Sequence, residues 1–146
     1  MTANRLVPSK ASPDLYQAVL QVDALIQKSD LPPQLMELVK IRASQINGCA
    51  FCLDLHSQAA RKADETQRRL DVLSGWREAD IYSPAERAAL AWTESLTNIS
   101  QTGAKDQDYE PLKAHFSDKD IVDLTILIGL INLFNRLAVS MRYVVA

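Results

Sequence analysis

The sequence predicts an all-α protein, a helical bundle of about six to seven helices. Apolar residues recur at intervals of three and four, as in Leu15, Val19, Val22 and Ile26, which is the spacing that one buried helix face produces. Only 4 glycines and 6 prolines occur, too few for the many turns of a β architecture. No paired strands or strand–helix–strand units are apparent. We expect a single domain over residues 1–146.

Start and stop signals divide the first half of the chain. Ser12-Pro13-Asp14 supplies a capping residue, a first-turn proline and an early acid for the first helix. Pro32-Pro33 ends that helix and opens the next, which reaches Asn47-Gly48. The elements expected here are an extended arm over residues 1–11 and helices over residues 13–28, 33–47 and 49–63.

The second half carries two serine caps. Ser83 and Glu86, three residues apart, can satisfy each other's backbone donors, and Ser117 and Asp120 form a similar start. A short helix capped by Asp64 or Thr66 should end before Ser74-Gly75. The other expected elements are a helix over residues 84–99, a polar linker over 101–107, a short helix over 108–116 and a final helix over 118–142. The final helix is apolar nearly all round, which favours a central position or a subunit interface.

The composition excludes several functions. A net charge of −2 argues against nucleic acid or an anionic membrane as the main partner, because neither is attracted without a basic surface. The first residues lack the apolar stretch of a signal peptide, and charged and amide residues interrupt the apolar segment 121–145, so we expect a buried helix there and not a membrane span. We therefore expect a cytoplasmic protein, in which a Cys-X-X-Cys pair is more often catalytic or metal-binding than structural.

The chemistry is concentrated around Cys49 and Cys52, the only cysteines of the chain, and His56. On a helix these three positions share one face. The two cysteine Cα atoms would then be about 5 Å apart, within the roughly 4.4–6.8 Å that a disulfide requires. A break at Gly48 would place both thiols in a first helical turn, where the dipole favours a thiolate, and His56 could take the thiol proton. The pattern indicates a nucleophile, a resolving thiol and a base.

Glu37, twelve residues before Cys49, and Ala60-Arg61 extend this pattern. With this spacing the sequence resembles the alkylhydroperoxidase D-like proteins of the carboxymuconolactone decarboxylase superfamily. The core of the resemblance covers about residues 35–92, and residues 132–137 are similar to the last helix of the family. The thioredoxin alternative for a Cys-X-X-Cys pair requires a preceding strand, and none is predicted here.

The resemblance implies an all-helical homo-oligomer, a trimer or hexamer, that reduces hydroperoxides in antioxidant defence. By this analogy Cys52 attacks the O–O bond and becomes a sulfenic acid, and Cys49 condenses with it to a disulfide. Glu37 and His56 would relay the proton of Cys52. A dithiol or protein reductant would reset the pair, without a cofactor or a resident metal ion. Phe51 departs from the family, because better-characterised members carry a second histidine at that position.

Two alternatives remain open. The first is a decarboxylase-like lyase that acts on small cyclic carboxylates, with His56 and Glu37 as acid and base, although that branch typically lacks the cysteine pair. The second is a non-catalytic oligomeric module that senses redox state or binds zinc. Cys49 and His56 would lie about 10.5 Å apart along the axis of one helix. At that separation the two side chains could bind the same zinc ion only in a strained coordination geometry. His115, near a predicted helix end, is expected to complement the helix dipole there.

Overall fold

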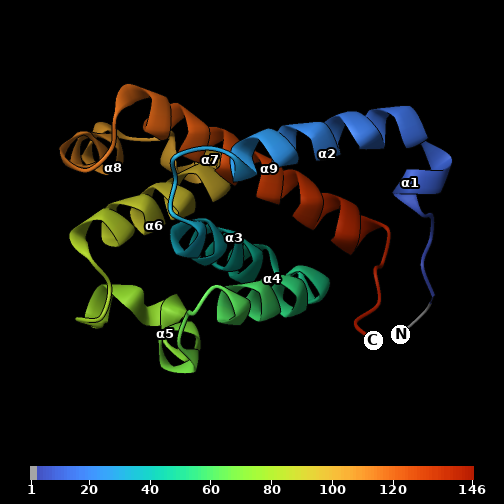
Figure 1. The fold of residues 1–146 in the computed structure, drawn as a ribbon, viewed down its shortest axis with the longest axis horizontal. Helices are drawn as coiled ribbons and strands as arrows, with labels where there is room; N and C mark the ends of the chain where they lie inside the picture. The colour runs from blue at the N-terminus through green and yellow to red at the C-terminus, as the bar shows by residue number, and fades with distance from the viewer. Residues whose placement is uncertain (1–2) are drawn as a thin grey trace.

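The computed structural model describes residues 3–146, and these residues form nine α-helices, two 3₁₀ helices and no strand (Figure 1). The predicted all-α fold is confirmed. In chain order the elements are α1 (Pro8–Ala11), α2 (Pro13–Gln27), α3 (Pro33–Asn47), α4 (Ala50–Lys62), α5 (Gln67–Asp71), η1 (Leu73–Glu78), α6 (Pro84–Thr97), α7 (Ile99–Thr102), α8 (Asp106–Tyr109), η2 (Glu110–Ala114) and α9 (Asp118–Ser140).

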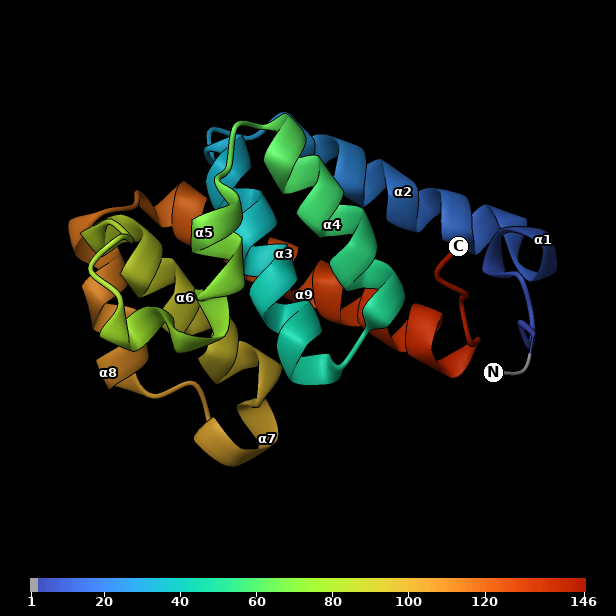
Figure 2. The same cartoon turned by 90° about the horizontal axis from the view of Figure 1, so that it is seen from below.

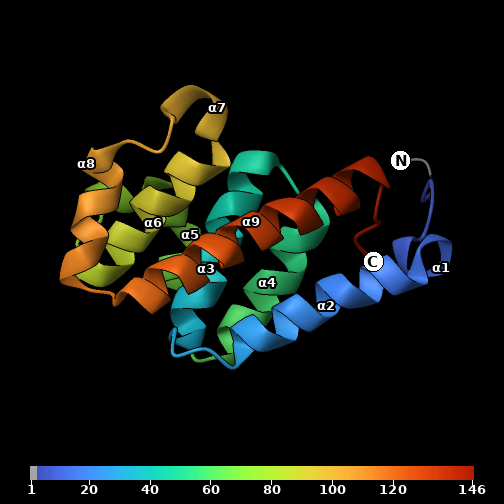
Figure 3. The ribbon, with the colours of Figure 1, turned by 90° about the horizontal axis from the view of Figure 1, so that it is seen from above.

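Helix α3 lies at the centre and packs against α4, α6 and α9. Figure 2 shows α4 beside α3, and Figure 3 shows α9 running across the bundle with α2 along one side. Leu38 and Val39 of α3 and Leu124 of α9 are fully buried, so the core follows the contacts of these central helices. The segment before α1 meets the end of α9, since the Arg5 N–H donates to the Met141 carbonyl over 2.9 Å.

The long predicted helices are confirmed, and their capping explains where they begin. The Glu86 N–H donates to Ser83 Oγ over 3.2 Å, and the Ser83 N–H donates to Glu86 Oε2 over 2.7 Å, which is the predicted reciprocal cap of α6. Ser117 Oγ accepts from the Asp120 N–H at the start of α9. Ser12 precedes α2 as expected, but its side chain makes no capping hydrogen bond.

The short elements differ from the predictions. Residues 8–11 of the predicted extended arm form α1, which begins at Pro8 because proline is suited to a first helical turn; residues 1–2 of the arm lie outside the described residues. The helical path after α5 continues through Gly75 as η1, with only a local kink at this residue. The predicted linker 101–107 includes the end of α7 and the start of α8.

The predicted helix over 108–116 is divided into α8 and η2. Pro111 lies in the first turn of η2, and since proline has no N–H to donate, an uninterrupted α-helix cannot pass through it without losing a hydrogen bond. The predicted helix 84–99 ends at Thr97 for a different reason: Asn98 leaves helical geometry and starts α7.

Helix α9 is, among residues 3–146, long and apolar enough to cross a membrane by length and composition alone. Its buried side chains, including Leu124, Leu127, Ile128 and Ile131, form the core against α2, α3, α4 and α6. These contacts account for the apolar residues on the inner face of α9. Val122 and Ile126 remain exposed on its outer face.

Candidate functional site

The site begins where α3 turns into α4. Gly48 has φ +65°, a left-handed conformation that glycine adopts without the steric penalty of a Cβ atom. The Cys49 N–H donates to the Ser44 carbonyl over 3.0 Å, which closes the end of α3. The chain can then reverse within two residues, so that Cys49 becomes the capping residue of α4.

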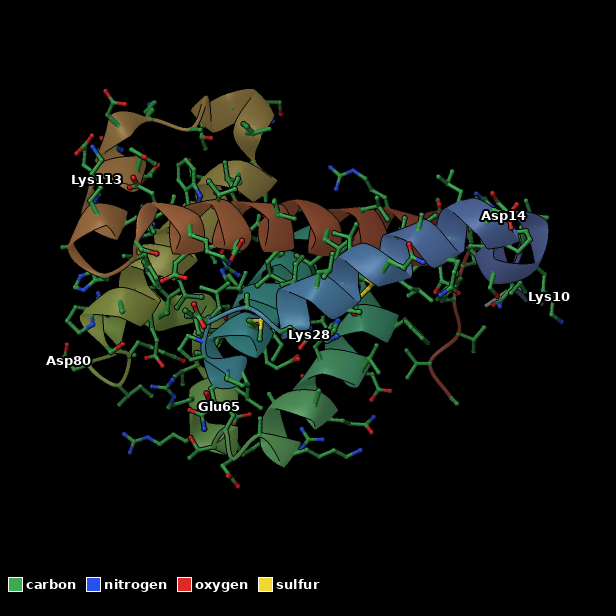
Figure 4. All side chains as sticks on the ribbon, turned by 45° about the horizontal axis from the view of Figure 1, so that its top comes forward. Lys10, Asp14, Lys28, Glu65, Asp80 and Lys113 are labelled. Carbon is green, nitrogen blue, oxygen red and sulfur yellow. A yellow bond between two sulfur atoms is a disulfide. The ribbon has the colours of Figure 1, made fainter. Side chains whose placement is uncertain are left out.

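Cys49 and Cys52 form a disulfide with their Cα atoms 5.3 Å apart, within the expected window. Figure 4 draws this disulfide as a yellow bond between two sulfur atoms. Cys49 Sγ accepts from the Cys52 N–H over 3.3 Å, so Cys49 caps α4 and Cys52 lies in its first turn. Cys49 itself has extended backbone angles, and the predicted common helical face therefore holds for Cys52 and His56 but not for Cys49. The two cysteines are 1% and 3% exposed.

His56 and Glu37 form the second part of the site. His56 Nδ1 lies 3.0 Å from Glu37 Oε2, and Lys40 Nζ donates to Glu37 Oε1 over 3.2 Å. Burial by itself raises the pKa of Glu37, but the hydrogen bond from His56 and the ammonium of Lys40 outweigh it and hold the pKa below its usual value of 4.5. Glu37 is therefore an anion that holds one nitrogen of His56 as a donor.

A pocket of about 210 Å³ opens beside Cys52 and His56. Its walls come from α2, α3, α4, α9 and the segment after α9, and most of them are apolar. The lining residues are Tyr16, Leu20, Asp23, Lys40, Phe51, Cys52, Leu55, His56, Leu127, Leu130, Ile131, Phe134, Leu137, Ala138 and Tyr143. Glu37 does not line the pocket and reaches it only through His56 and Lys40. An apolar organic molecule fits this lining better than a strongly hydrated ion.

Lys40, whose side chain is only 7% exposed, is a residue of the site that the sequence did not lead us to expect. Its position three residues after Glu37, on the same face of α3, was the signal that could have identified it. The pocket walls from α2 and α9 carry no comparable sequence signal, because those residues resemble ordinary core positions. His115 is exposed at the end of η2 and does not belong to the site.

A hydrogen-bonded amide network, buried at Asn135 and Ser44, holds the α3–α4 turn against α9. Asn47 Nδ2 donates to Asn135 Oδ1 and to Asn132 Oδ1, each over 2.9 Å, and Asn135 Nδ2 donates to Ser44 Oγ over 3.0 Å. Ser44 also supplies the carbonyl that accepts from the Cys49 N–H. The network thus connects the apolar core helix directly to the turn that positions the disulfide.

The site residues are not arranged as metal ligands. Within residues 3–146, no group of three or more histidine, cysteine, aspartate or glutamate side chains could hold a metal ion. The two sulfur atoms are bonded to each other, and His56 Nδ1 is directed to Glu37. The arrangement instead provides a dithiol that can be oxidised and a histidine–carboxylate pair that can move a proton.

Comparison with known proteins agrees with this arrangement. Residues 13–95 match the model of the carboxymuconolactone decarboxylase family. The uncharacterized protein YdfG of Bacillus subtilis is 38% identical over 130 residues, 89% of this chain and 88% of YdfG. A structure from Agrobacterium tumefaciens, of a protein of unknown function that carries the name "Putative Antioxidant Defence Protein AhpD", is 42% identical, covers 98% of both chains and has a TM-score of 0.94.

A more distant structure shares the fold. The alkylhydroperoxidase AhpD core protein of Ralstonia eutropha JMP134 is 25% identical with a TM-score of 0.82, over 94% of this chain and 74% of its own. The family model and the structural neighbours thus lead to the same group, as the spacing of Glu37, the cysteine pair and His56 predicts. This chain belongs to the carboxymuconolactone decarboxylase family and has the AhpD-like fold.

Proposed function

We propose that the protein is a thiol-dependent peroxidase of antioxidant defence that reduces organic hydroperoxides. The observation that carries this proposal is the Cys49–Cys52 disulfide in the first turn of α4, beside the His56–Glu37 pair and an apolar pocket. A peroxidatic cycle needs these parts: a nucleophilic thiol, a second thiol within bonding distance, a base and a place for the substrate.

Cys52 is the attacking thiol in this proposal, because it lines the pocket together with His56 whereas Cys49 does not. Its thiolate attacks one oxygen of the hydroperoxide, the O–O bond breaks, and the leaving alkoxide takes a proton to become an alcohol. Cys52 is then a sulfenic acid. The Cys49 thiol attacks the Cys52 sulfur, water leaves, and the disulfide forms.

Glu37 and His56 supply the proton transfer. When Nδ1 of His56 donates to the Glu37 carboxylate, Nε2 is left as the acceptor for the thiol proton. A glutamate whose pKa lies below its usual value stays ionised at neutral pH and keeps the imidazole in that tautomer. Lys40 stabilises the same anion and brings a proton donor to the pocket wall, where the alkoxide would leave.

The partners of the reaction follow as proposals. A dithiol or protein reductant would reopen the disulfide, and the cycle would operate in the cytoplasm, where reducing thiols are available.

We propose a homo-oligomer, a trimer or hexamer, because apolar side chains on one face of α9, among them Val122, Ile126 and Leu133, are left exposed in the single chain. The antioxidant assignment of the 42% identical Agrobacterium protein supports the reaction class.

Mass spectrometry of the Cys49–Cys52 peptide tests the proposal. Fully reduced protein is treated with one equivalent of cumene hydroperoxide, with and without dimedone. We expect rapid formation of the intramolecular disulfide in the wild type and dimedone capture on Cys52 in the Cys49→Ser variant. Thiols that stay reduced would refute the peroxidase proposal. Turnover of a cyclic carboxylate that survives loss of both cysteines would favour the lyase alternative instead.

A further inference from the structure

One wall of the apolar pocket carries a buried ammonium group. Lys40 is 6% exposed and lines the pocket together with Cys52 and His56. Among residues 3–146 its Nζ has one hydrogen-bond partner, Glu37 Oε1 at 3.2 Å. An ammonium group has three donors, so the protein leaves two N–H donors of Lys40 unused. Because a buried charged group is costly unless its hydrogen bonds are made, these two donors indicate a ligand with acceptor oxygen atoms.

The unused donors of Lys40 lie on the same side of the pocket as the reacting groups. Lys40 Nζ and His56 Nδ1 bind the two oxygens of one carboxylate, Glu37 Oε1 and Oε2, at 3.2 and 3.0 Å. Cys52 precedes His56 by one turn of α4 and lines the same pocket. An oxygen atom bound by Lys40 is therefore held near His56 and not in a remote part of the pocket.

The rest of the lining indicates a small aromatic molecule. Four aromatic side chains line the pocket, those of Tyr16, Phe51, Phe134 and Tyr143, and aromatic rings pack favourably edge to face or offset. Phe51 and Tyr143 already meet edge to face, with ring centroids 5.0 Å apart. The volume of about 210 Å³ is below the roughly 300–1,000 Å³ of pockets for drug-sized ligands. One substituted ring fits this space better than a long chain or a fused ring system.

Asp23 limits the charge that the ligand can carry. This half-buried residue of α2 lines the same pocket. Among the described residues of the lining, only Lys40 and His56 are basic, and Glu37 already offsets one positive charge. A second acidic group on the ligand would face the carboxylate of Asp23 without a further cation to offset it. The pocket therefore favours a molecule with one carboxylate over a dicarboxylate or a phosphate dianion.

We propose that Lys40 recognises the carboxylate of a small aromatic molecule, and that the peroxides reduced in this pocket include aromatic peroxycarboxylic acids. This substrate class rests on the proposed function. The Cys52 thiolate attacks the terminal oxygen of the neutral peroxyacid, and that oxygen keeps its hydrogen. The O–O bond breaks, Cys52 becomes a sulfenic acid, and the carboxylate leaves with the bonding electron pair. Two electrons pass from sulfur to the peroxide, and the leaving group needs no proton.

The charges of the site balance when such a carboxylate forms. Once His56 has taken the proton of Cys52, His56 and Lys40 are cations and Glu37 is an anion. The thiolate offsets the remaining positive charge before the reaction, and the aromatic carboxylate offsets it afterwards. An alkoxide from an alkyl hydroperoxide is a much stronger base and takes a proton as it leaves. Only the carboxylate therefore remains as a charged hydrogen-bond partner for Lys40.

Calorimetric titration of benzoate into the disulfide form tests this recognition without turnover. We expect saturable one-to-one binding in the wild type and at least about tenfold weaker binding in Lys40→Met, because a hydrogen bond to a charged group is lost. Lys113→Met, which removes an exposed lysine of η2, is the control and should bind benzoate like the wild type. Equal affinities in all three proteins, or no saturable binding in the wild type, would overturn the proposal.

A comparison of ligands needs no variant. Benzamide has nearly the shape of benzoate but no charge, and terephthalate carries a second carboxylate. We expect each to bind the wild type at least about tenfold more weakly than benzoate, because one lacks the charge-assisted hydrogen bond and the other meets Asp23. Benzamide that binds as tightly as benzoate would overturn carboxylate recognition, and terephthalate that does so would overturn the limit to one carboxylate.

Stopped-flow oxidation of the reduced protein by m-chloroperoxybenzoic acid tests the substrate class. Peroxyacids oxidise free thiols unaided, so the readout is the ratio of the wild-type rate to the Lys40→Met rate. We expect a ratio of at least about ten, with competitive inhibition by benzoate that Lys40→Met lacks. Equal rates would overturn the substrate class. Benzoate binding to the disulfide form involves no peroxide, so failure of the proposed function and failure of this inference can be told apart.

Discussion

His56 Nδ1 on α4 and Glu37 Oε2 on α3 lie 3.0 Å apart, and this contact joins two helices across the turn that carries the disulfide. Both side chains are largely buried. The carboxylate determines which imidazole nitrogen carries the proton, and Lys40 balances its charge from the other side. The orientation of the imidazole is thus held from α3, whereas His56 itself belongs to α4, as does Cys52.

Replacing Glu37 by glutamine should slow the oxidation of Cys52. The neutral amide no longer holds the His56 tautomer, and loss of a general base typically reduces a rate by about 10²-fold or more. Stopped-flow oxidation of the reduced variant by cumene hydroperoxide measures the effect. Glu110→Gln, which alters an exposed ion pair with Lys113, is the control and should react like the wild type. Equal rates in all three proteins would remove Glu37 from the mechanism.

The ionisation of Glu37 should also make stability depend on pH. The pKa of Glu37 in the folded protein lies below 4.5, so the stabilisation is fully present above about pH 4.5 and is lost as the pH falls through the lower folded-state pKa. Urea unfolding from pH 3 to pH 7 should show the wild type losing stability at the acid end more steeply than Glu37→Gln. Lys40→Met should move the loss to higher pH, because the ammonium that lowers the pKa is gone. Parallel curves for the wild type and Glu37→Gln would contradict this.

Asn135 should be important for stability although it touches neither sulfur. It is 1% exposed, accepts from Asn47 and donates to Ser44. Asn135→Leu removes one acceptor of the half-buried Asn47, which keeps Asn132, and the donor to the buried Ser44 Oγ, which costs about 1–3 kcal/mol of unfolding free energy. Gln21→Leu on the exposed face of α2 makes a comparable chemical change and should stay within about 0.5 kcal/mol. Chemical denaturation measures both, and similar values for the two would argue against the network.

Gly48 and Gly75 offer a test of backbone conformation alone. An added Cβ atom would meet nothing within 4 Å at either position, but only Gly48 has positive φ. Gly48→Ala should therefore destabilise the fold by about 1 kcal/mol, whereas Gly75→Ala should be close to neutral or slightly stabilising. Thermal unfolding of the two variants provides the comparison. A Gly48→Ala protein as stable as Gly75→Ala would show that the turn can be closed in another way.

The elements that the sequence predicted well depend on neighbours in the chain. Ser83 and Glu86 cap each other over three residues, and proline opens α2, α3 and α6. The short helices were predicted less well. Residues 8–11 and 99–102 are single turns, and a four-residue helix leaves too short an apolar pattern to recognise.

The sequence by itself determined the all-α class, the long helices and the closeness of Cys49, Cys52 and His56, because capping and helical spacing act over three or four residues. Only the tertiary structure decided that Glu37 of α3 meets His56 of α4, and that the rings of Phe51 and Tyr143 meet edge to face beside the two cysteines. These contacts join residues 19 to 92 positions apart. They arise from how the apolar faces of α2, α3, α4 and α9 pack, which local spacing does not specify.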